Sequence, residues 1–148
     1  MKNDLNCFMS FALEHAYKAL DLNEIPVGAI IVKNNEIISY GINQKEYLND
    51  PTAHAEIMAI KSAAKVLNSW RLEECSMYVT LEPCPMCAGA IIQARIKKLV
   101  FGAYNLEWGA CGTVFNIFSF LPSGKKIEVI SGIMEKECEK ILKNIPFS

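Results

Sequence analysis

The chain has 148 residues, of which 51% are hydrophobic and 21% charged, and its formal net charge is −1. This composition is typical of one compact domain with a sizeable core, so we expect residues 1–148 to form a single domain. A nearly neutral charge argues against a general nucleic-acid binder, and no apolar run approaches the roughly 18–20 residues of a membrane span.

The first 42 residues predict a helix followed by a β-hairpin. Apolar residues recur at helical spacing from residue 5 to about 20, and the charged residues among them are not typical of a signal peptide. Two runs rich in β-branched residues, 27–33 and 36–42, flank Asn34-Asn35. Two asparagines between such runs strongly indicate a hairpin turn.

The rest of the chain predicts alternating helices and strands, with a loop at 104–112. Expected helices are 52–67, with cap residues in Asp50-Pro51-Thr52, then 84–94 and 135–144, the last stopped by Pro146; expected strands are 77–81, 98–102 and 126–131. Such alternation favours a layered α/β sheet with helices on its faces, and ligands bind at the carboxyl ends of its strands.

Two short motifs carry the side chains of a zinc site: His54-Ala55-Glu56 and Pro83-Cys84-Pro85-Met86-Cys87. Zinc prefers thiolate and imidazole donors, and three protein ligands leave its fourth position for a water that ionises near neutral pH. Cysteines three residues apart suit a helix start, where amide N–H groups favour thiolate. We therefore predict one Zn2+ per chain, held by His54, Cys84 and Cys87.

Glu56 is the predicted catalytic acid/base. Residues two apart on a regular helix differ by about 200° in direction, so His54 and Glu56 can both reach the metal only near a helix N-terminus. Together, the motifs match H-x-E…P-C-x-x-C, the signature of nucleobase zinc deaminases.

Each motif alone permits other interpretations. A C-x-x-C pair is common in redox sites and structural zinc sites, although a structural site would need a fourth ligand, and Cys75 and Cys111 have no paired spacing. His15 lies on the apolar side of the first predicted helix and is interpreted as a packed or half-buried histidine. The four cysteines outside the motif are expected to be buried free thiols in a reducing, cytoplasmic environment.

Several stretches resemble the bacterial tRNA-specific adenosine deaminases, members of the cytidine deaminase-like superfamily. They are residues 25–29 (IPVGA), 50–59 (DPTAHAEIMA), 71–72 (RL), 78–90 (YVTLEPCPMCAGA), 95–96 (RI), 100–103 (VFGA) and 132–133 (GI). The resemblance implies a three-layer α/β/α fold around a central five-stranded mixed sheet, a homodimer and a cytoplasmic location.

The resemblance also implies roles for individual residues. His54, Cys84 and Cys87 would bind zinc, Glu56 would shuttle protons, Asn43 would contact the target nucleoside, and Val27 would line the base pocket. The partner would be a tRNA anticodon stem-loop, in which adenosine at the wobble position is converted to inosine.

The chain departs from this family at positions expected to face RNA. Asn105 and Glu107 stand where the family usually has Asp and Lys, Trp108 is a large aromatic in the same loop, and residues 145–148 carry no basic tail. Basic residues elsewhere form either an RNA-binding patch or ordinary solvated surface: Arg95, Lys97, Lys98, Lys125 and Lys126.

Two other functions therefore stay open. One is deamination of a free base or nucleoside, such as cytosine, guanine or a cytidine, on the same scaffold. The other, from a different class, is a non-catalytic nucleic-acid-binding module stabilised by zinc. Glu56 argues against the second, because a structural site has no use for an unliganded carboxylate beside the metal.

Overall fold

The computed structural model describes residues 2–122, 124–143 and 145, and a five-stranded sheet forms its centre. Its strands are β1 (Gly28–Lys33), β2 (Glu36–Ile42), β3 (Cys75–Leu81), β4 (Lys98–Ala103) and β5 (Glu128–Ile130), arranged in the order β2-β1-β3-β4-β5. β1 runs antiparallel to β2 and β3, whereas β3 and β4, and β4 and β5, are parallel. The mixed five-stranded sheet expected from the sequence is confirmed.

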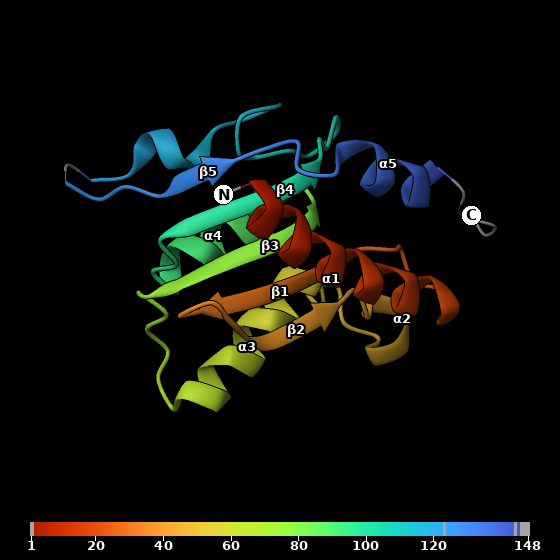
Figure 1. The fold of residues 1–148 in the computed structure, drawn as a ribbon, viewed down its shortest axis with the longest axis horizontal. Coiled ribbons are helices and arrows are strands. Elements are labelled where there is room, and N and C mark those ends of the chain that lie inside the picture. Colours follow the sequence, from red (N-terminus) through yellow and green to blue (C-terminus); the bar gives the residue numbers. More distant parts are fainter. Residues whose placement is uncertain (1, 123, 144, 146–148) are drawn as a thin grey trace.

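Helices cover both faces of the sheet and complete the expected three layers (Figure 1). They are α1 (Lys2–Asp21), α2 (Lys45–Leu48), α3 (Ala55–Leu67), α4 (Pro85–Gln93), α5 (Glu135–Lys143) and a short 3-10 helix, η1 (Ile117–Phe120). α1 and α5 pack on one face, and α3 and α4 pack on the other.

The alternation of side chains along β1 divides the core between these faces. Ala29 and Ile31 belong to the cluster under α3 and α4, while Ile30 and Val32 belong to the cluster under α1 and α5. Successive strand residues point to opposite faces, so a strand with both faces covered is apolar throughout. The turn after β1 is the predicted hairpin, with Asn34-Asn35 at φ 51° and 62°. Positive φ at both positions is the requirement of a type I′ turn.

The structure corrects several predicted boundaries. The helix expected from residue 52 begins at Ala55, and the strand expected at 126–131 covers only Glu128–Ile130. Neither α2 nor η1 was predicted from the sequence. The last helix is described through Lys143, and its predicted end at residue 144 and stop at Pro146 lie outside the described residues.

The two predictions for residues outside the metal motif had different outcomes. His15 is half-buried and stacks on Tyr40 with ring centroids 4.2 Å apart, as expected of a packed histidine. All six cysteines are free, but Cys7 is exposed, so the expectation that the remaining thiols are buried is wrong for this residue. Among the described residues, no helix is both long and apolar enough to span a membrane.

Candidate zinc centre and substrate pocket

His54 and Glu56 lie at the first turn of α3, where the backbone changes from extended to helical. Asp50 Oδ1 accepts hydrogen bonds from the backbone N–H and the hydroxyl of Thr52, both at 2.8 Å, and this local turn redirects the chain before the helix. His54 is the N-cap, with φ −77° and ψ 154°, so the regular helix begins after it. The two side chains therefore escape the wide angular separation that a continuous helix would impose.

The two cysteines lie at the start of α4, which follows β3. Cys84 is the N-cap, with φ −74° and ψ 174°, and Pro85 occupies the first turn, where its missing N–H leaves no helical hydrogen bond unmade. The N–H of Ala88 donates to the carbonyl of Cys84 at 2.9 Å and closes that turn. This geometry directs both thiols toward the start of α3.

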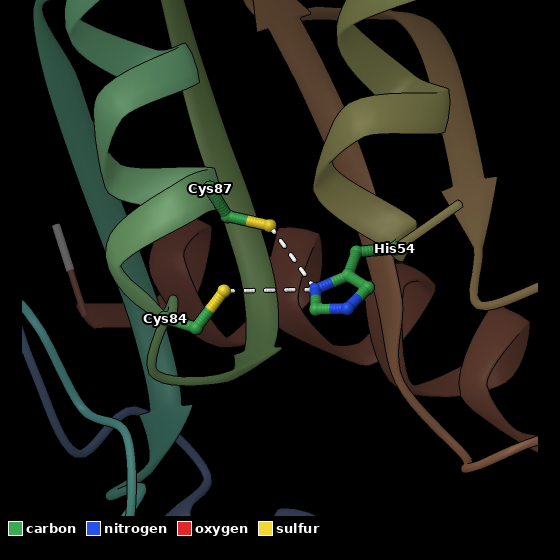
Figure 2. Close-up of side chains that lie close together, drawn as sticks. All are labelled: His54, Cys84 and Cys87. Atoms are coloured by element: carbon green, nitrogen blue, oxygen red, sulfur yellow. Dashed lines mark hydrogen bonds between the residues drawn. The ribbon is translucent and has the colours of Figure 1, made fainter. Parts of the chain in front are cut away.

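Figure 2 shows the three side chains converging from the starts of the two helices. The Sγ atoms of Cys84 and Cys87 lie 3.7 and 3.4 Å from Nδ1 of His54, and the ligand atoms all lie within 4.8 Å of one another. A tetrahedral zinc ion, with bonds of about 2.3 Å to sulfur and 2.0 Å to nitrogen, would hold such atoms about 3.5 Å apart. The spacing and the donor set both fit zinc.

The ionisable groups of this cluster differ in acidity. Hydrogen bonding by Cys87, with a further contribution from His54, lowers the pKa of Cys84 to about 4. The same contact with Cys84, together with burial, raises the pKa of Cys87. Zinc deprotonates a coordinating thiol outright, so both would be thiolates around the ion. Burial raises the pKa of Glu56, which is only 4% exposed, to about 7.

A cavity of about 700 Å³ opens beside the cluster. His54, Glu56 and Cys84 line it, together with Val27 and Asn43, the two residues predicted to contact substrate. Val27 immediately precedes β1 and Asn43 follows β2, and the backbone N–H of Asn43 donates to the carbonyl of Val27 at 3.3 Å. The hairpin thus brings both to one wall, 16 positions apart in the sequence.

Comparison with known proteins decides the family. The sequence profile described as "Cytidine and deoxycytidylate deaminase zinc-binding region" matches residues 2–103, which include His54, Cys84 and Cys87. A tRNA-specific adenosine deaminase of Bacillus subtilis (strain 168) is 44% identical over 135 residues, covering 91% of this chain and 84% of the relative. The chain belongs to the tRNA-specific adenosine deaminase family. In this family of zinc-dependent deaminases, His54, Cys84 and Cys87 form the site for one zinc ion.

Solved structures agree with this assignment. One, from a study of A-to-I editing by tRNA:A34 deaminases at the wobble position of transfer RNA, has a TM-score of 0.87 and 41% identity, covering 91% of this chain and 98% of that one. A guanine deaminase from Bacillus subtilis has a TM-score of 0.65 and 37% identity, covering 81% of this chain and 79% of that one. The cytidine deaminase-like fold predicted from the sequence is confirmed.

The loop that departs from the family pattern lies on the pocket wall. Asn105, Glu107 and Trp108 all line the cavity, as does Lys45 at the start of α2. Our sequence reasoning missed Lys45, because no expected element included it, and it missed Glu82, a buried carboxylate that also lines the cavity. The signal for Glu82 was available: an acidic residue between a largely apolar strand and the cysteine motif.

The predicted basic patch is only partly brought together. Arg95, Lys97, Lys125 and Lys126 line a second cavity of about 520 Å³, while Lys98 lines a different one. Arg95 follows the end of α4, whereas Cys84 precedes its start, so this second cavity lies at the far end of that helix from the zinc centre. Its contact with RNA stays a prediction.

Proposed function

We propose that this protein hydrolyses adenosine to inosine, with release of ammonia, at the wobble position of a tRNA anticodon. The observation that carries the proposal is the buried Glu56 beside the His54–Cys84–Cys87 cluster, on a wall of a cavity of about 700 Å³. Family membership supports the substrate, because the close relatives are named for their action on tRNA adenosine.

The reaction needs a nucleophile and a proton carrier. Zinc, when bound, supplies the nucleophile by making a water molecule acidic enough to ionise near neutral pH. The carboxylate of Glu56 accepts the proton of that water and delivers it to ring nitrogen N1 as oxygen adds to C6. Glu56 then carries the proton of the new C6 hydroxyl to the amino nitrogen, and the C6–N bond breaks as the C6 carbonyl forms, which releases ammonia. Burial raises the pKa of Glu56 above that of an exposed carboxyl, and a carboxyl of raised pKa is suited both to accept and to return a proton.

Asn43 and Val27 are proposed to hold the adenine base. Asn43 is 4% exposed yet lies on the cavity wall, so its amide can donate to and accept from the nucleoside, while Val27 offers an apolar surface against the ring. The target base must leave its loop to enter, as bases do in the active sites of enzymes that modify them.

Substitution of Glu56 tests the catalytic role. Glu56→Gln should lower the rate of inosine formation in a transcribed anticodon stem-loop by at least about 100-fold while zinc content stays at one ion per chain. Glu36→Gln is the matched control, because Glu36 is exposed at the start of β2 and does not line the cavity. Near-normal turnover by Glu56→Gln would overturn the assignment.

A free base or nucleoside is the second candidate substrate. Glu107 places a negative charge on the cavity wall where the family usually has lysine, the net charge is −1, and a guanine deaminase shares the fold. The two candidates separate in one assay: inosine in the stem-loop against ammonia released from free guanine, cytosine or cytidine. If the protein released ammonia from a free base and formed no inosine in the stem-loop, the free base would be the substrate and the tRNA proposal would be wrong.

We further propose that the chain is a single zinc-dependent deaminase domain that works as a homodimer in the cytoplasm, where a tRNA substrate would be met. Large apolar side chains support the dimer, because they are exposed in one segment between β4 and β5: Leu106 (81% exposed), Trp108, Val114, Phe115 and Phe120 (85% exposed). Apolar surface gathered in one region is typical of protein interfaces. Sedimentation equilibrium would measure the oligomeric state, and a monomer at micromolar concentration would contradict the proposal.

A further inference from the structure

Two buried carboxylates lie outside the zinc cluster and take no part in the proposed reaction. Glu24 and Glu82 are each 1% exposed, and each accepts hydrogen bonds from a segment distant in the sequence. Burial of a carboxylate costs free energy unless it is hydrogen-bonded, and these contacts offset that cost.

Glu82 binds the loop that follows β4. Its Oε1 accepts from the backbone N–H of Asn105 at 3.2 Å and from the hydroxyl of Thr113. Its Oε2 accepts from the N–H groups of Cys111 at 3.0 Å and Thr113 at 3.1 Å. Every partner is a donor, so the site is built for the ionised carboxylate and not for a group that itself carries N–H.

The backbone of the same loop packs closely against Glu82 at Gly109. A Cβ at this position would lie 2.7 Å from the carboxyl carbon of Glu82 and 2.4 Å from the carbonyl oxygen of Asn105. Only a residue without a side chain lets the backbone approach this closely. Asn105 extends the arrangement outward, because its Oδ1 accepts from the N–H of Trp108 at 3.0 Å. The carboxylate thus fixes a segment that ends in the pocket wall.

Glu24 holds a second part of the pocket wall, the start of α2. Its Oε1 and Oε2 accept from the backbone N–H groups of Glu46 at 3.2 Å and Tyr47 at 2.7 Å, in the first turn of α2. The residue preceding α2 makes no side-chain capping bond, so Glu24 supplies the cap from 22 positions away. Lys45 belongs to that turn and, like Asn43 close before it in the sequence, lines the cavity.

We propose that Glu24 and Glu82 are positioning residues that set the shape of the substrate pocket by holding two separate walls. Glu82 fixes the wall of Asn105, Glu107 and Trp108, and Glu24 fixes the wall of Lys45. Neither carboxylate delivers a proton or binds the metal. The inference rests on the proposed deamination for its kinetic readout, but the positions of the walls can be measured without any turnover.

Glu82→Gln is the decisive change, because one carboxylate oxygen becomes an NH2 group that faces backbone N–H donors. The first readout is the fluorescence of Trp108, measured in a Trp70→Phe background so that a single tryptophan remains. Trp70 lines the other cavity, at the far end of α4. We expect Glu82→Gln to shift the Trp108 emission and raise its quenching by acrylamide, whereas Glu24→Gln leaves both at the parent values.

The second readout is the separation of KM from kcat on the anticodon stem-loop, with zinc content measured on the same samples. Both Glu82→Gln and Glu24→Gln should raise KM by about tenfold and leave kcat within about threefold, with one zinc per chain. Loss of zinc, or a fall in kcat at unchanged KM, would overturn the proposal by placing these residues in the chemical step.

Variants at two loop positions keep the test independent of the folding of Glu82→Gln. Gly109→Ala moves the loop off an intact carboxylate and should reproduce the Trp108 change. Thr113→Val removes one donor, while Thr113→Ser keeps it and should restore the parent signal. Unchanged Trp108 fluorescence in both Glu82→Gln and Gly109→Ala would refute the inference. A stem-loop that the parent protein does not deaminate would refute the proposed function alone, because the fluorescence test would still stand.

Discussion

Substitution of Gly41 in β2 by alanine should weaken the zinc site through the fold. A Cβ at Gly41 would lie 2.2 Å from the carbonyl oxygen of Ala55 and 2.5 Å from the N–H nitrogen of Ala59, about 1.2 Å short of ordinary contact at 3.4 Å in the first case. Both atoms belong to the backbone of α3, so the whole helix start must move. Overpacking of this kind costs about 1–3 kcal/mol, and backbone clashes belong at the upper end.

The position of this clash at the start of α3 also predicts an effect on zinc binding. Ala55 follows His54 directly, so a shift of the α3 start moves one zinc ligand relative to the two on α4. We expect Gly41→Ala to lower the free energy of unfolding by about 2–3 kcal/mol and to weaken zinc binding by at least about tenfold. Chemical denaturation measures the first quantity, and competition with a chromogenic chelator measures the second.

Two other glycines provide the controls. A Cβ at Gly28 would lie 2.1 Å from the carbonyl oxygen of Ala12 and 2.6 Å from the nitrogen of Ala16, on α1 at the opposite face of the sheet. Gly28→Ala should therefore destabilise the protein similarly, yet leave zinc affinity within about twofold. Gly89 in α4 has no atom within 4 Å of an added Cβ, so Gly89→Ala should stabilise by about 0.5–1 kcal/mol. Equal loss of zinc affinity in Gly41→Ala and Gly28→Ala would refute the reasoning.

Three further predictions concern the metal, the pocket wall and pH. Removal of zinc by a chelator should abolish turnover but retain most of the far-UV circular dichroism, because both core clusters are built from side chains alone; complete unfolding would indicate a structural zinc. Glu107→Lys should tighten stem-loop binding and steepen its salt dependence by up to about one in log–log slope, while Glu36→Lys, with the same charge change on the exposed hairpin, should not. Burial lowers the pKa of His15 below 6.5, so on acidification the unfolded chain binds a proton at this residue before the folded protein does. The free energy of unfolding should therefore fall as the pH drops below 6.5. His15→Gln should reduce this pH dependence, measured by urea denaturation at a series of pH values.

The parts of the fold that the sequence predicted are those with a periodic or local signal. Each strand and each long helix has its apolar pattern, and the hairpin turn needed only Asn34-Asn35. The zinc ligands were predictable because each motif lies at a helix start, where residues two or three apart in sequence converge. His54 as N-cap realises the one local geometry in which it and Glu56 share a site.

The parts that could not be predicted depend on contacts between distant segments. α2 has four residues, too few for a periodic pattern, and its cap comes from Glu24. The start of α3 lies at Ala55 because the Asp50–Thr52 turn satisfies its own donors and delays the helix. β5 is short because it pairs with β4 only from Lys98 to Val100. None of these features can be predicted from a short stretch of neighbouring residues.

The zinc centre and the pocket walls therefore depend on different interactions. The ligands are set by the packing of α3 and α4 on one face of the sheet, where an added methyl at Gly41 would clash with backbone. The walls, in our proposal, are held by carboxylate hydrogen bonds to the start of α2 and to the loop after β4, and substitutions there leave that packing undisturbed. A change such as lysine to glutamate at position 107 falls entirely in the second set. We therefore expect such a change to alter which substrate enters without moving the zinc ligands, so that the metal motif indicates the reaction and the Asn105–Trp108 loop indicates the substrate.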